Sequence, residues 1–321
     1  STKTLRPLLH PRGGLKLVTW NACSLREIDM FCVLDEMIRR KIDIVAIQET
    51  KDWRGRPETA HYYTQRGMHR TFTSTASACQ KKKDGITIIM SPRATHCWEA
   101  AGKELHGLGH RLLRLRLTDK RFGNMWVVSA YAPTQASRDQ GSDEFEAFYH
   151  HLQDTIQKIP RRDRLFILGD FNARIGRDKA TWEHIIGQYG MPDENDNGRT
   201  LLEFCSDNAL VVSNTFFRQR RAGTWKCNVN QQWYSLDHVL TRQADAADVL
   251  NIKVATSMHF RSDHRPLLAT LRLKPRPKLQ TGPKLKGRQV AAALRADSSG
   301  AEKYAQCVAR TLSNRTLTAA E

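Results

Sequence analysis

The stretch that decides the fold is residues 164–176, RLFILGDFNARIG. Residues 165–168 are a short apolar run of the kind that forms a strand buried on both faces. The run stops at Gly169, and Asp170 and Asn172 follow two residues apart, so both side chains point the same way if strand geometry persists. A carboxylate and an amide at the end of a buried strand can orient a water molecule or a phosphate oxygen. The alternative is an ordinary turn, in which such side chains bond nearby backbone amides.

The first part of the chain contains a strand–helix–strand unit. A strand is predicted at residues 15–21 (LKLVTWN), an amphipathic helix at 27–40, and an apolar strand that ends at Gln48 and Glu49. The buried stripe of the helix is predicted from apolar residues that recur at spacings of three and four, namely Ile28, Phe31, Leu34 and Ile38.

The apolar run at 165–168 is the last strand of a second strand–helix–strand unit. This unit begins with a strand at 126–133 and continues through a helix at 143–159. Asp143 and Glu146 predict a capping box at the start of this helix, because the two side chains can satisfy the first free backbone N–H groups. The unit therefore ends at the strand that carries Asp170.

The remaining segments predict short strands joined by turns. Residues 51–84 are polar, aromatic and basic and are expected to form surface loops with a short strand. Strands are expected at 85–92 and 110–118 and a hairpin at 225–240, and short links favour antiparallel pairing. Because each half begins with a strand–helix–strand unit, the sequence predicts a four-layer α/β sandwich. Two mixed, mostly antiparallel sheets would be flanked by helices.

Four segments are expected along the chain. Residues 1–14 are a flexible lead-in, 15–273 form the folded domain, 274–289 form a basic linker rich in proline, and 290–321 form a partly helical tail. Residues 274–288 contain six basic residues and three prolines without an acid, which is typical of an extended linker.

Composition excludes several classes of protein. With 321 residues, 40% of them hydrophobic, the chain can fill a substantial core and is not a disordered protein. No apolar run approaches the ~20 residues that span a bilayer, and residues 1–14 lack the apolar block of a signal peptide. The seven cysteines are far apart without a C-x-x-C pair, which favours reduced thiols over a zinc module or a disulfide framework. We expect an intracellular protein without a membrane partner.

The net charge of +18 favours a polyanionic partner, nucleic acid before membrane. Residues 273–321 hold ten Lys or Arg against three Asp or Glu, so residues 1–272 still carry +11. A general role in solubility is the alternative. Basic side chains interleaved with aromatic ones suit a nucleic-acid strand. The residues predicted to contact it are Arg218, Arg220, Arg221, Trp225, Lys81, Lys82 and Lys83.

Seven polar residues lie within or beside short apolar strands, mostly at their ends: Asn21, Glu49, Asp170, Asn172, Asp237, Asp263 and His264. If the strands present these ends at one edge, four carboxylates converge. Four like charges need a cation, a shared proton or an imidazolium. Mg²⁺ or Mn²⁺ suits oxygen ligands and leaves positions for water and a substrate phosphate. Independent turn and cap residues are the alternative.

These residues lie in motifs that resemble, in order and spacing, the endonuclease/exonuclease/phosphatase superfamily. The motifs are TWN at 19–21, QET at 48–50, SAYAP at 129–133, GDFNARIG at 169–176, LDH at 236–238 and SDHRP at 262–266. The resemblance covers about residues 15–273 and makes this segment the catalytic domain. It is strongest to the apurinic/apyrimidinic-type endonuclease domain of LINE-like, RTE-type non-LTR retrotransposons and craniofacial-development-protein-2-like relatives. The supporting stretches are GDFNARIG, NDNGRTLLEFC at 195–205, and Thr224 with Trp225 ahead of LDH.

The resemblance implies a metal-dependent phosphodiesterase that acts on DNA in the nucleus. Glu49 would ligate Mg²⁺ or Mn²⁺ with Asn21 beside it, and Asp263 would support the metal or the histidine. No organic cofactor is implied.

The resemblance also implies roles in the chemistry. Asp170 would align or deprotonate the attacking water, and Asn172 would hold the phosphate. His264, oriented by Asp237, would stabilise the charge that builds on the phosphate oxygens, and Tyr131 would contact the scissile phosphate. Positioning and neutralisation of developing charge are what phosphoryl chemistry requires.

Two positions depart from the superfamily pattern. Cys23 stands where repair-type relatives carry an acid, and His238 follows Asp237 where an aromatic residue is common. These departures count against abasic-site repair more than against general nicking. The alternatives to a nicking enzyme are an abasic-site repair endonuclease, a domesticated nucleic-acid-binding protein with a decayed site, and a lipid or small-molecule phosphatase. Reverse transcription by this chain is not expected, because it lacks the Asp-Asp pair of a polymerase.

Overall fold

The structure, a computed structural model, describes residues 14–51, 60–64, 67–74, 85–120, 123–141, 143–258, 260–273 and 275. Backbone contacts group Ser1–Arg276 into one compact unit, to which all described elements belong. A second unit, Pro277–Glu321, lies outside the described residues, as do the predicted tail and nearly all of the predicted lead-in and linker.

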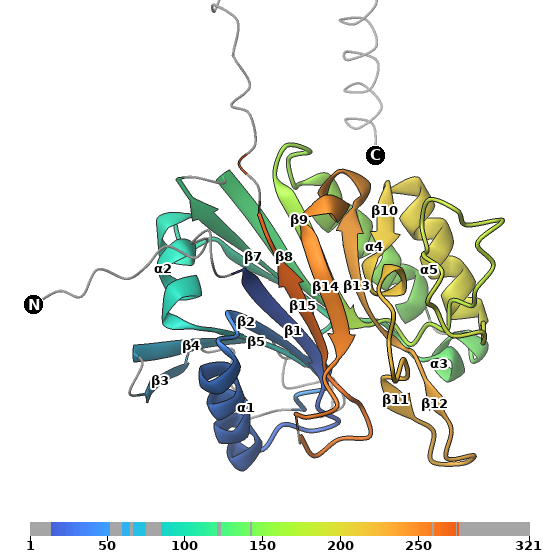
Figure 1. Ribbon diagram of the computed structural model, residues 1–321, viewed down its shortest axis with the longest axis horizontal. Helices are drawn as coiled ribbons and strands as arrows, with labels where there is room; N and C mark the ends of the chain where they lie inside the picture. The colour runs from blue at the N-terminus through green and yellow to red at the C-terminus, as the bar shows by residue number, and fades with distance from the viewer. Residues whose placement is uncertain are drawn as a thin grey trace, which may run out of the picture. The chain divides into compact units, whose positions relative to one another are not determined.

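Two large β-sheets form the centre of the described unit (Figure 1). The first has seven strands: β1 (Leu15–Asn21), β2 (Ile44–Gln48), β3 (Ala60–Thr64), β4 (Gly67–Ser74), β5 (Ile86–Met90), β14 (Val249–Val254) and β15 (Leu267–Leu271). The second has six: β6 (Leu105–Leu108), β7 (Leu112–Asp119), β8 (Gly123–Tyr131), β9 (Arg164–Asp170), β10 (Leu210–Val212) and β13 (Asp237–Arg242). A separate ribbon consists of β11 (Trp225–Lys226) and β12 (Trp233–Tyr234).

Each sheet contains one parallel pair. The strand orders are β14-β15-β1-β2-β5-β4-β3 and β10-β13-β9-β8-β7-β6, and only β1 with β2 and β8 with β9 are parallel among these described strands. Both parallel pairs are the ones predicted from the two strand–helix–strand units. Two mixed, mostly antiparallel sheets are thereby confirmed.

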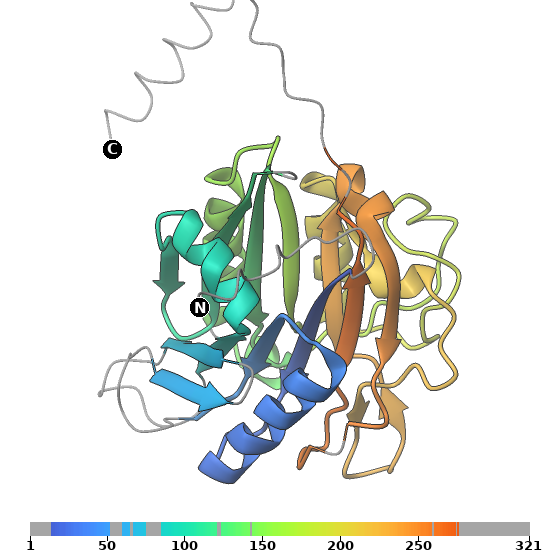
Figure 2. The same ribbon diagram turned by 60° about the vertical axis from the view of Figure 1, so that its left-hand side comes forward.

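Helices cover the outer faces of both sheets (Figure 1, Figure 2). The helices are α1 (Glu27–Arg40), α2 (Pro92–Ala100), α3 (Gln135–Asp139), α4 (Glu144–Gln157) and α5 (Asp196–Asp207), with 3₁₀ turns at Ser213–Phe216 and Gln243–Asp248. One buried cluster lies between α1 and the first sheet, and another between α4, α5 and the second sheet. A third lies between the two sheets and includes Ala94, Cys97 and Trp98 of α2, so this helix packs against the inner layer. The predicted four-layer sandwich is confirmed.

Strand β9 is buried along its whole length. Phe166 and Leu168 point into the layer between the sheets, whereas Leu165 and Ile167 point toward α4 and α5. A strand with both faces buried needs apolar residues at every position, which the 165–168 run supplies. At Gly169, a Cβ atom would lie only 2.0 Å from the Ala130 carbonyl oxygen, so glycine is required for β9 to pair with β8 at the site edge.

The buried face of α1 differs from the predicted stripe. Ile28 and Phe31 are 59% and 53% exposed. The face that packs on the first sheet consists of Met30, Val33, Leu34 and Met37. Both sets of residues recur at helical spacing, so periodicity alone cannot choose between them. Packing on the first sheet buries the face of α1 that carries Met30 and Met37.

Two further expectations are wrong. Asp143 makes no side-chain cap bond, because its backbone is already helical (φ −61, ψ −13) and an N-cap needs an extended residue. Within residues 51–84, β3 and β4 form a hairpin where one short strand was expected. Helix α2, capped by the Ser91 hydroxyl and started by Pro92, was not predicted.

None of the described helices is long and apolar enough to cross a membrane.

Candidate active site

The predicted site residues meet at one edge of the sandwich, where six strands either finish or start. Parallel strands β1, β2, β8 and β9 end there, and antiparallel β13 and β15 begin there. The register places Asp170 beside both Tyr131 and Asp237. The residues brought together are Asn21, Glu49, Tyr131, Asp170, Asn172, Asp237, Asp263 and His264.

Asp170 lies at the centre of the site and is 1% exposed. Its Oδ1 accepts from the Asn172 backbone N–H at 2.9 Å, and its Oδ2 accepts from Asn21 Nδ2 at 2.8 Å. Burial and the neighbouring charge of Asp237 raise the pKa of Asp170 to about 7, although His264 and the hydrogen bonds act in the opposite direction. The carboxyl can therefore take up a proton near neutral pH.

His264 is paired with Asp237. The two groups are 2.9 Å apart at His264 Nδ1 and Asp237 Oδ2, so Nδ1 carries a proton and donates it to the carboxylate. Burial lowers the pKa of His264, but the charge and the hydrogen bond of Asp237 outweigh burial and raise it to about 9. The ring is thus an imidazolium at neutral pH. Its Nε2 lies 4.0 Å from Asp170 Oδ2.

Glu49 has one oxygen in two hydrogen bonds and the other beside a lysine. Oε1 accepts from Tyr131 Oη at 2.8 Å and from Asn21 Nδ2 at 3.0 Å. Oε2 lies 3.4 Å from Lys51 Nζ, in a side chain that is 20% exposed. Burial and the charge of Glu49 raise the pKa of Tyr131, so its phenol keeps the proton that it donates.

The chain turns sharply where these strands end. Cys23, Glu49 and Asn172 have left-handed backbones, with φ of 54, 51 and 48. Non-glycine residues in this conformation are strained and cluster at functional sites. Strand geometry therefore does not persist to Asn172, so the condition under which its side chain would point the same way as that of Asp170 is not met. Its N–H caps Asp170 instead, while its Nδ2 donates to the Ala132 carbonyl at 2.9 Å.

Asp263 has both oxygens engaged. The Cys23 thiol donates to Oδ1 at 2.8 Å, and Trp225 Nε1 donates to Oδ2 at 3.0 Å. Burial and the Asp263 carboxylate raise the pKa of Cys23 to about 12. The Cys23 backbone N–H donates to Asn21 Oδ1 at 2.9 Å, which fixes the Asn21 amide with its nitrogen toward Glu49 and Asp170.

The donor set fits a hard divalent cation at Glu49. Glu49 Oε2 is a carboxylate oxygen that faces the cleft, and one such ligand together with waters and a phosphate is a usual arrangement for Mg²⁺. Asn21 offers its NH₂ group on this side, and both oxygens of Asp263 already accept hydrogen bonds. Of the predicted metal ligands, Glu49 is thus the one with an oxygen turned to the cleft.

The site opens into a cleft of about 710 Å³. Its lining includes three residues that the sequence analysis did not single out, Lys51, Arg174 and Asn195. Arg174 stacks over the Tyr234 ring, 5.1 Å from its centroid, and Asn195 caps α5 and donates to the Asn172 carbonyl at 3.2 Å. Arg174 and Asn195 lie in the quoted stretches GDFNARIG and NDNGRTLLEFC, so motif membership was the available signal.

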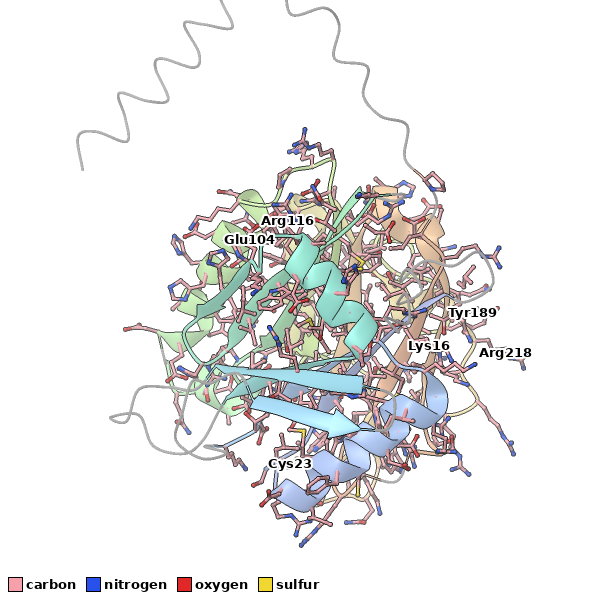
Figure 3. All side chains as sticks on the ribbon, turned by 90° about the vertical axis from the view of Figure 1, so that its left-hand side faces the viewer. Lys16, Cys23, Glu104, Arg116, Tyr189 and Arg218 are labelled. Carbon is pink, nitrogen blue, oxygen red and sulfur yellow. The ribbon has the colours of Figure 1, made fainter. Side chains whose placement is uncertain are left out.

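The predicted DNA-contacting residues are divided by the structure. Trp225 lines the cleft, and its ring lies 6.4 Å from that of His264. Arg218, Arg220 and Arg221 are exposed on the loop before β11 and do not line the cleft. Figure 3 shows Arg218 at a different part of the surface from Cys23. The predicted contacts at 81–83 lie outside the described residues.

His238 has a structural position beneath the site. It is fully buried, and burial lowers the pKa of its ring, which keeps it neutral. Its Nε2 bonds the Ala173 carbonyl at 2.8 Å, and its Nδ1 lies 3.3 Å from Asn214 Nδ2. Because a carbonyl only accepts, Nε2 carries the proton. His238 therefore ties β13 to the turn that holds Asn172.

The two-sheet sandwich with carboxylates, an amide and a histidine at one edge defines a hydrolase of the nuclease and phosphatase class. Residues 18–264 match the sequence profile of the Endonuclease/Exonuclease/phosphatase family, and the chain belongs to this family.

Two relatives are craniofacial development protein 2 from Bos taurus and from Tragulus javanicus. Each is 32% identical over 261 residues, which is 80% of this chain but only 40% and 42% of the relative. The chain thus spans about two fifths of the length of these relatives.

Solved structures share the fold. The endonuclease domain of TRAS1, a telomere-specific non-LTR retrotransposon, has a TM-score of 0.57 and 16% identity and covers 81% of this chain and 99% of its own. The AP endonuclease LMAP from Leishmania major has a TM-score of 0.60 and 14% identity, with coverages of 82% and 89%.

Proposed function

We propose that this chain is a divalent-metal-dependent phosphodiesterase that nicks DNA in the nucleus, as a retrotransposon-type endonuclease does. The observation that carries the proposal is the placement of Asp170. It is a buried carboxyl with a pKa raised to about 7, and it lies between the Asn21 amide and the His264 imidazolium. A proton acceptor and a fixed positive donor thus face the same small volume.

The residues divide the work of phosphodiester hydrolysis. Asp170 aligns the attacking water and takes its proton. His264 Nε2 donates to a phosphate oxygen, and Asp237 holds the ring in the orientation and tautomer that make this possible. Such a charge-assisted hydrogen bond strengthens as negative charge builds in the transition state. Asn172 supports the carboxylate through its N–H and adds a polar contact to the phosphate.

Glu49 is the residue that holds the divalent ion, which when bound polarises the phosphate and neutralises its charge. Tyr131 and Asn21 bind Glu49 Oε1, and this leaves Oε2 oriented into the cleft. Tyr131 is placed to contact the phosphate through the same hydroxyl. Asp263 acts by orienting neighbouring groups, since Cys23 and Trp225 hold both of its oxygens.

DNA is the substrate that the surface supports best. The cleft is lined by cations and aromatic rings, including Lys51, Arg174, Trp225 and Tyr234, which suit phosphates and unpaired bases. Residues 1–272 carry a net charge of +11. A lipid or small-molecule phosphatase has no need of that excess. Two of the solved structures with the same fold are named for a retrotransposon endonuclease and an AP endonuclease.

One assay tests the proposal. Supercoiled plasmid, a duplex with an abasic site, and a phosphoinositide are each incubated with the full chain and Mg²⁺, Mn²⁺ or a chelator. We expect plasmid nicking with Mg²⁺ or Mn²⁺ that disappears with the chelator. Cleavage confined to the abasic duplex would assign a repair endonuclease instead, and cleavage confined to the phosphoinositide would assign a phosphatase.

A second candidate is a nucleic-acid-binding protein whose site has decayed. Cys23, in place of an acid that repair-type relatives carry, is the observation in its favour, because it removes a carboxylate from the metal side. This candidate predicts salt-sensitive DNA binding without nicking in either metal. His264→Ala serves as the control preparation, because any nicking equal to that of the wild type would come from a contaminant.

A further inference from the structure

We propose that Cys23, Asp263 and His264 form a separate binding site for a thiophilic divalent cation of the Zn²⁺ type. Each residue offers one ligand atom, and these atoms lie within 4.8 Å of one another. Cys23 follows β1, and the other two residues precede β15. Because β1 and β15 are antiparallel neighbours, the two loops emerge side by side from a rigid sheet.

The chemistry of the three ligands selects the cation. Sulfur, imidazole nitrogen and carboxylate oxygen are the ligands of Zn²⁺, and three protein ligands with an open fourth position are typical of its non-structural sites. Mg²⁺ prefers oxygen alone. Glu49 offers only oxygen, so hard and thiophilic cations are directed to different positions in one cleft.

His264 is already arranged as a metal ligand. Its Nδ1 is bonded to Asp237, a fully buried carboxylate, so Nε2 is the ring atom that can bind a cation once it has lost its proton. Metal-binding histidines commonly donate their second ring nitrogen to a carboxylate in this way, and the carboxylate makes the ring a better ligand.

The Cys23 thiol donates its proton to Asp263 Oδ1 at 2.8 Å, and a cation can take the place of that proton. On binding, the S–H bond of Cys23 and the Nε2–H bond of the His264 imidazolium break, bonds from the sulfur and from Nε2 to the metal form, and both protons leave to solvent. With bonds of roughly 2.3 Å to sulfur and 2.0–2.2 Å to oxygen, a tetrahedral ion holds these two atoms about 3.5 Å apart, so the pair opens by less than about 1 Å.

Hydrogen bonds hold the backbone of the cluster in place. The Cys23 N–H donates to Asn21 Oδ1 at 2.9 Å, and the Ser262 hydroxyl donates to the Asn21 carbonyl at 2.8 Å. The His264 N–H donates to the Ser262 hydroxyl at 3.0 Å. The two loops are therefore bonded to each other before any ion binds.

Occupation of this site removes His264 Nε2 from the phosphate. A thiophilic cation is thus expected to inhibit nicking even when Mg²⁺ is saturating. This consequence rests on the proposed function, whereas binding of the cation does not.

Cobalt tests the binding step directly. The metal-free full chain is titrated with Co²⁺, and the near-ultraviolet sulfur-to-cobalt charge-transfer band is recorded. We expect the band in the wild type and in Cys227→Ser, a control at a second cysteine that lines the cleft, and not in Cys23→Ser. A band that survives in Cys23→Ser, or its absence from the wild type, overturns the proposal.

A labelling experiment needs no variant. Zn²⁺ should protect Cys23, but not Cys227, from a thiol-reactive maleimide, as read by mass spectrometry of peptides. Equal labelling of Cys23 with and without Zn²⁺ contradicts the site even if Cys23→Ser fails to fold.

Zn²⁺ inhibition of Mg²⁺-dependent nicking links the site to activity. In Cys23→Ser, the Zn²⁺ concentration for half inhibition should rise by at least the roughly 10- to 100-fold that loss of a supporting residue costs a metal site. An unchanged concentration overturns the link. If no preparation nicks DNA, the proposed function fails, while the cobalt band and the labelling still decide the cation site.

Discussion

The two strand–helix–strand units place different chemistry at equivalent positions. In the first, β1 ends at Asn21 and Glu49 follows β2; in the second, β8 ends at Tyr131 and β9 ends at Asp170. The donors cross between the units, since Asn21 donates to Asp170 and Tyr131 donates to Glu49. Each unit therefore orients the acid of the other.

The difference between the two acids comes from their surroundings. Asp170 is 1% exposed and lies beside Asp237, so burial and like charge raise its pKa to about 7. The Glu49 side chain is 20% exposed and lines the cleft, with Oε2 held only by the ion pair with Lys51 at 3.4 Å. Two acids from similar local patterns are thus suited to different tasks, proton uptake and cation binding.

The largest expected effect is at Asp170. Asp170→Asn keeps the size of the side chain but removes the proton acceptor, so single-turnover nicking should fall about 10³-fold, within the range of general-base catalysis. Higher Mg²⁺ should not restore it, which distinguishes this acid from Glu49. Wild-type nicking by the variant would remove Asp170 from the proposed chemistry.

His264→Ala should reduce the nicking rate about 10²-fold, because it removes a donor that strengthens in the transition state. DNA affinity, measured in Ca²⁺, should change little. The double variant with Asp170→Asn should be much less impaired than the product of the two losses, since both residues act on one step. Full additivity would show that they act independently.

Glu49→Gln should mainly change the metal requirement. We expect the Mg²⁺ concentration for half-maximal nicking to rise more than in Tyr131→Phe, which keeps the Glu49 carboxylate but removes the hydroxyl that supports it and contacts the phosphate, and which should cost about 10- to 100-fold. Metal titrations of both variants measure this. If added metal restored nicking to Asp170→Asn but not to Glu49→Gln, the roles of the two acids in proton uptake and cation binding would have to be exchanged.

The pH dependence should reflect the second unit and the histidine pair. Because the pKa of Asp170 is raised to about 7, the rate should fall about tenfold per unit below that pH as the carboxylate is protonated. Because the pKa of His264 is raised to about 9, the rate should also fall above that pH as the imidazolium is lost. Single-turnover profiles test both limbs, and an unchanged acid limb in Asp170→Asn would assign it to another group.

The smallest effect is expected at Gln48, the residue before Glu49. Gln48 bridges the sheets by accepting from Thr19 Oγ1 at 3.1 Å and donating to Ser129 Oγ at 3.0 Å. Gln48→Leu should lower the free energy of unfolding by about 1–3 kcal/mol, because the buried hydroxyls of Thr19 and Ser129 lose their hydrogen bonds to Gln48. Urea denaturation measures this loss, and Thr118→Ala, at a half-buried hydroxyl on β7, is the control with a smaller cost.

Elements with strong local patterns were predicted from the sequence, and elements with ambiguous ones were not. The apolar runs that became β1, β2 and β9 have little freedom to be anything but buried strands. The prediction of the buried face of α1 was wrong, because two overlapping sets of apolar residues both recur at helical spacing. Helix α2 was missed because its apolar content is low, although Ser91 and Pro92 mark its start.

By itself, the sequence determined the two strand–helix–strand units and the residue types at the strand ends, because these depend on the spacing of apolar residues within short segments of the chain. Only the tertiary structure decided which groups meet. Asn21 and Asp170 are 149 residues apart in the chain and 2.8 Å apart in space. The raised pKa of Asp170, the partial exposure of Glu49 and the closeness of Cys23 to His264 arise when two sheets stack and bring those ends to one edge. Burial and neighbouring charge belong to the assembled site and not to any segment.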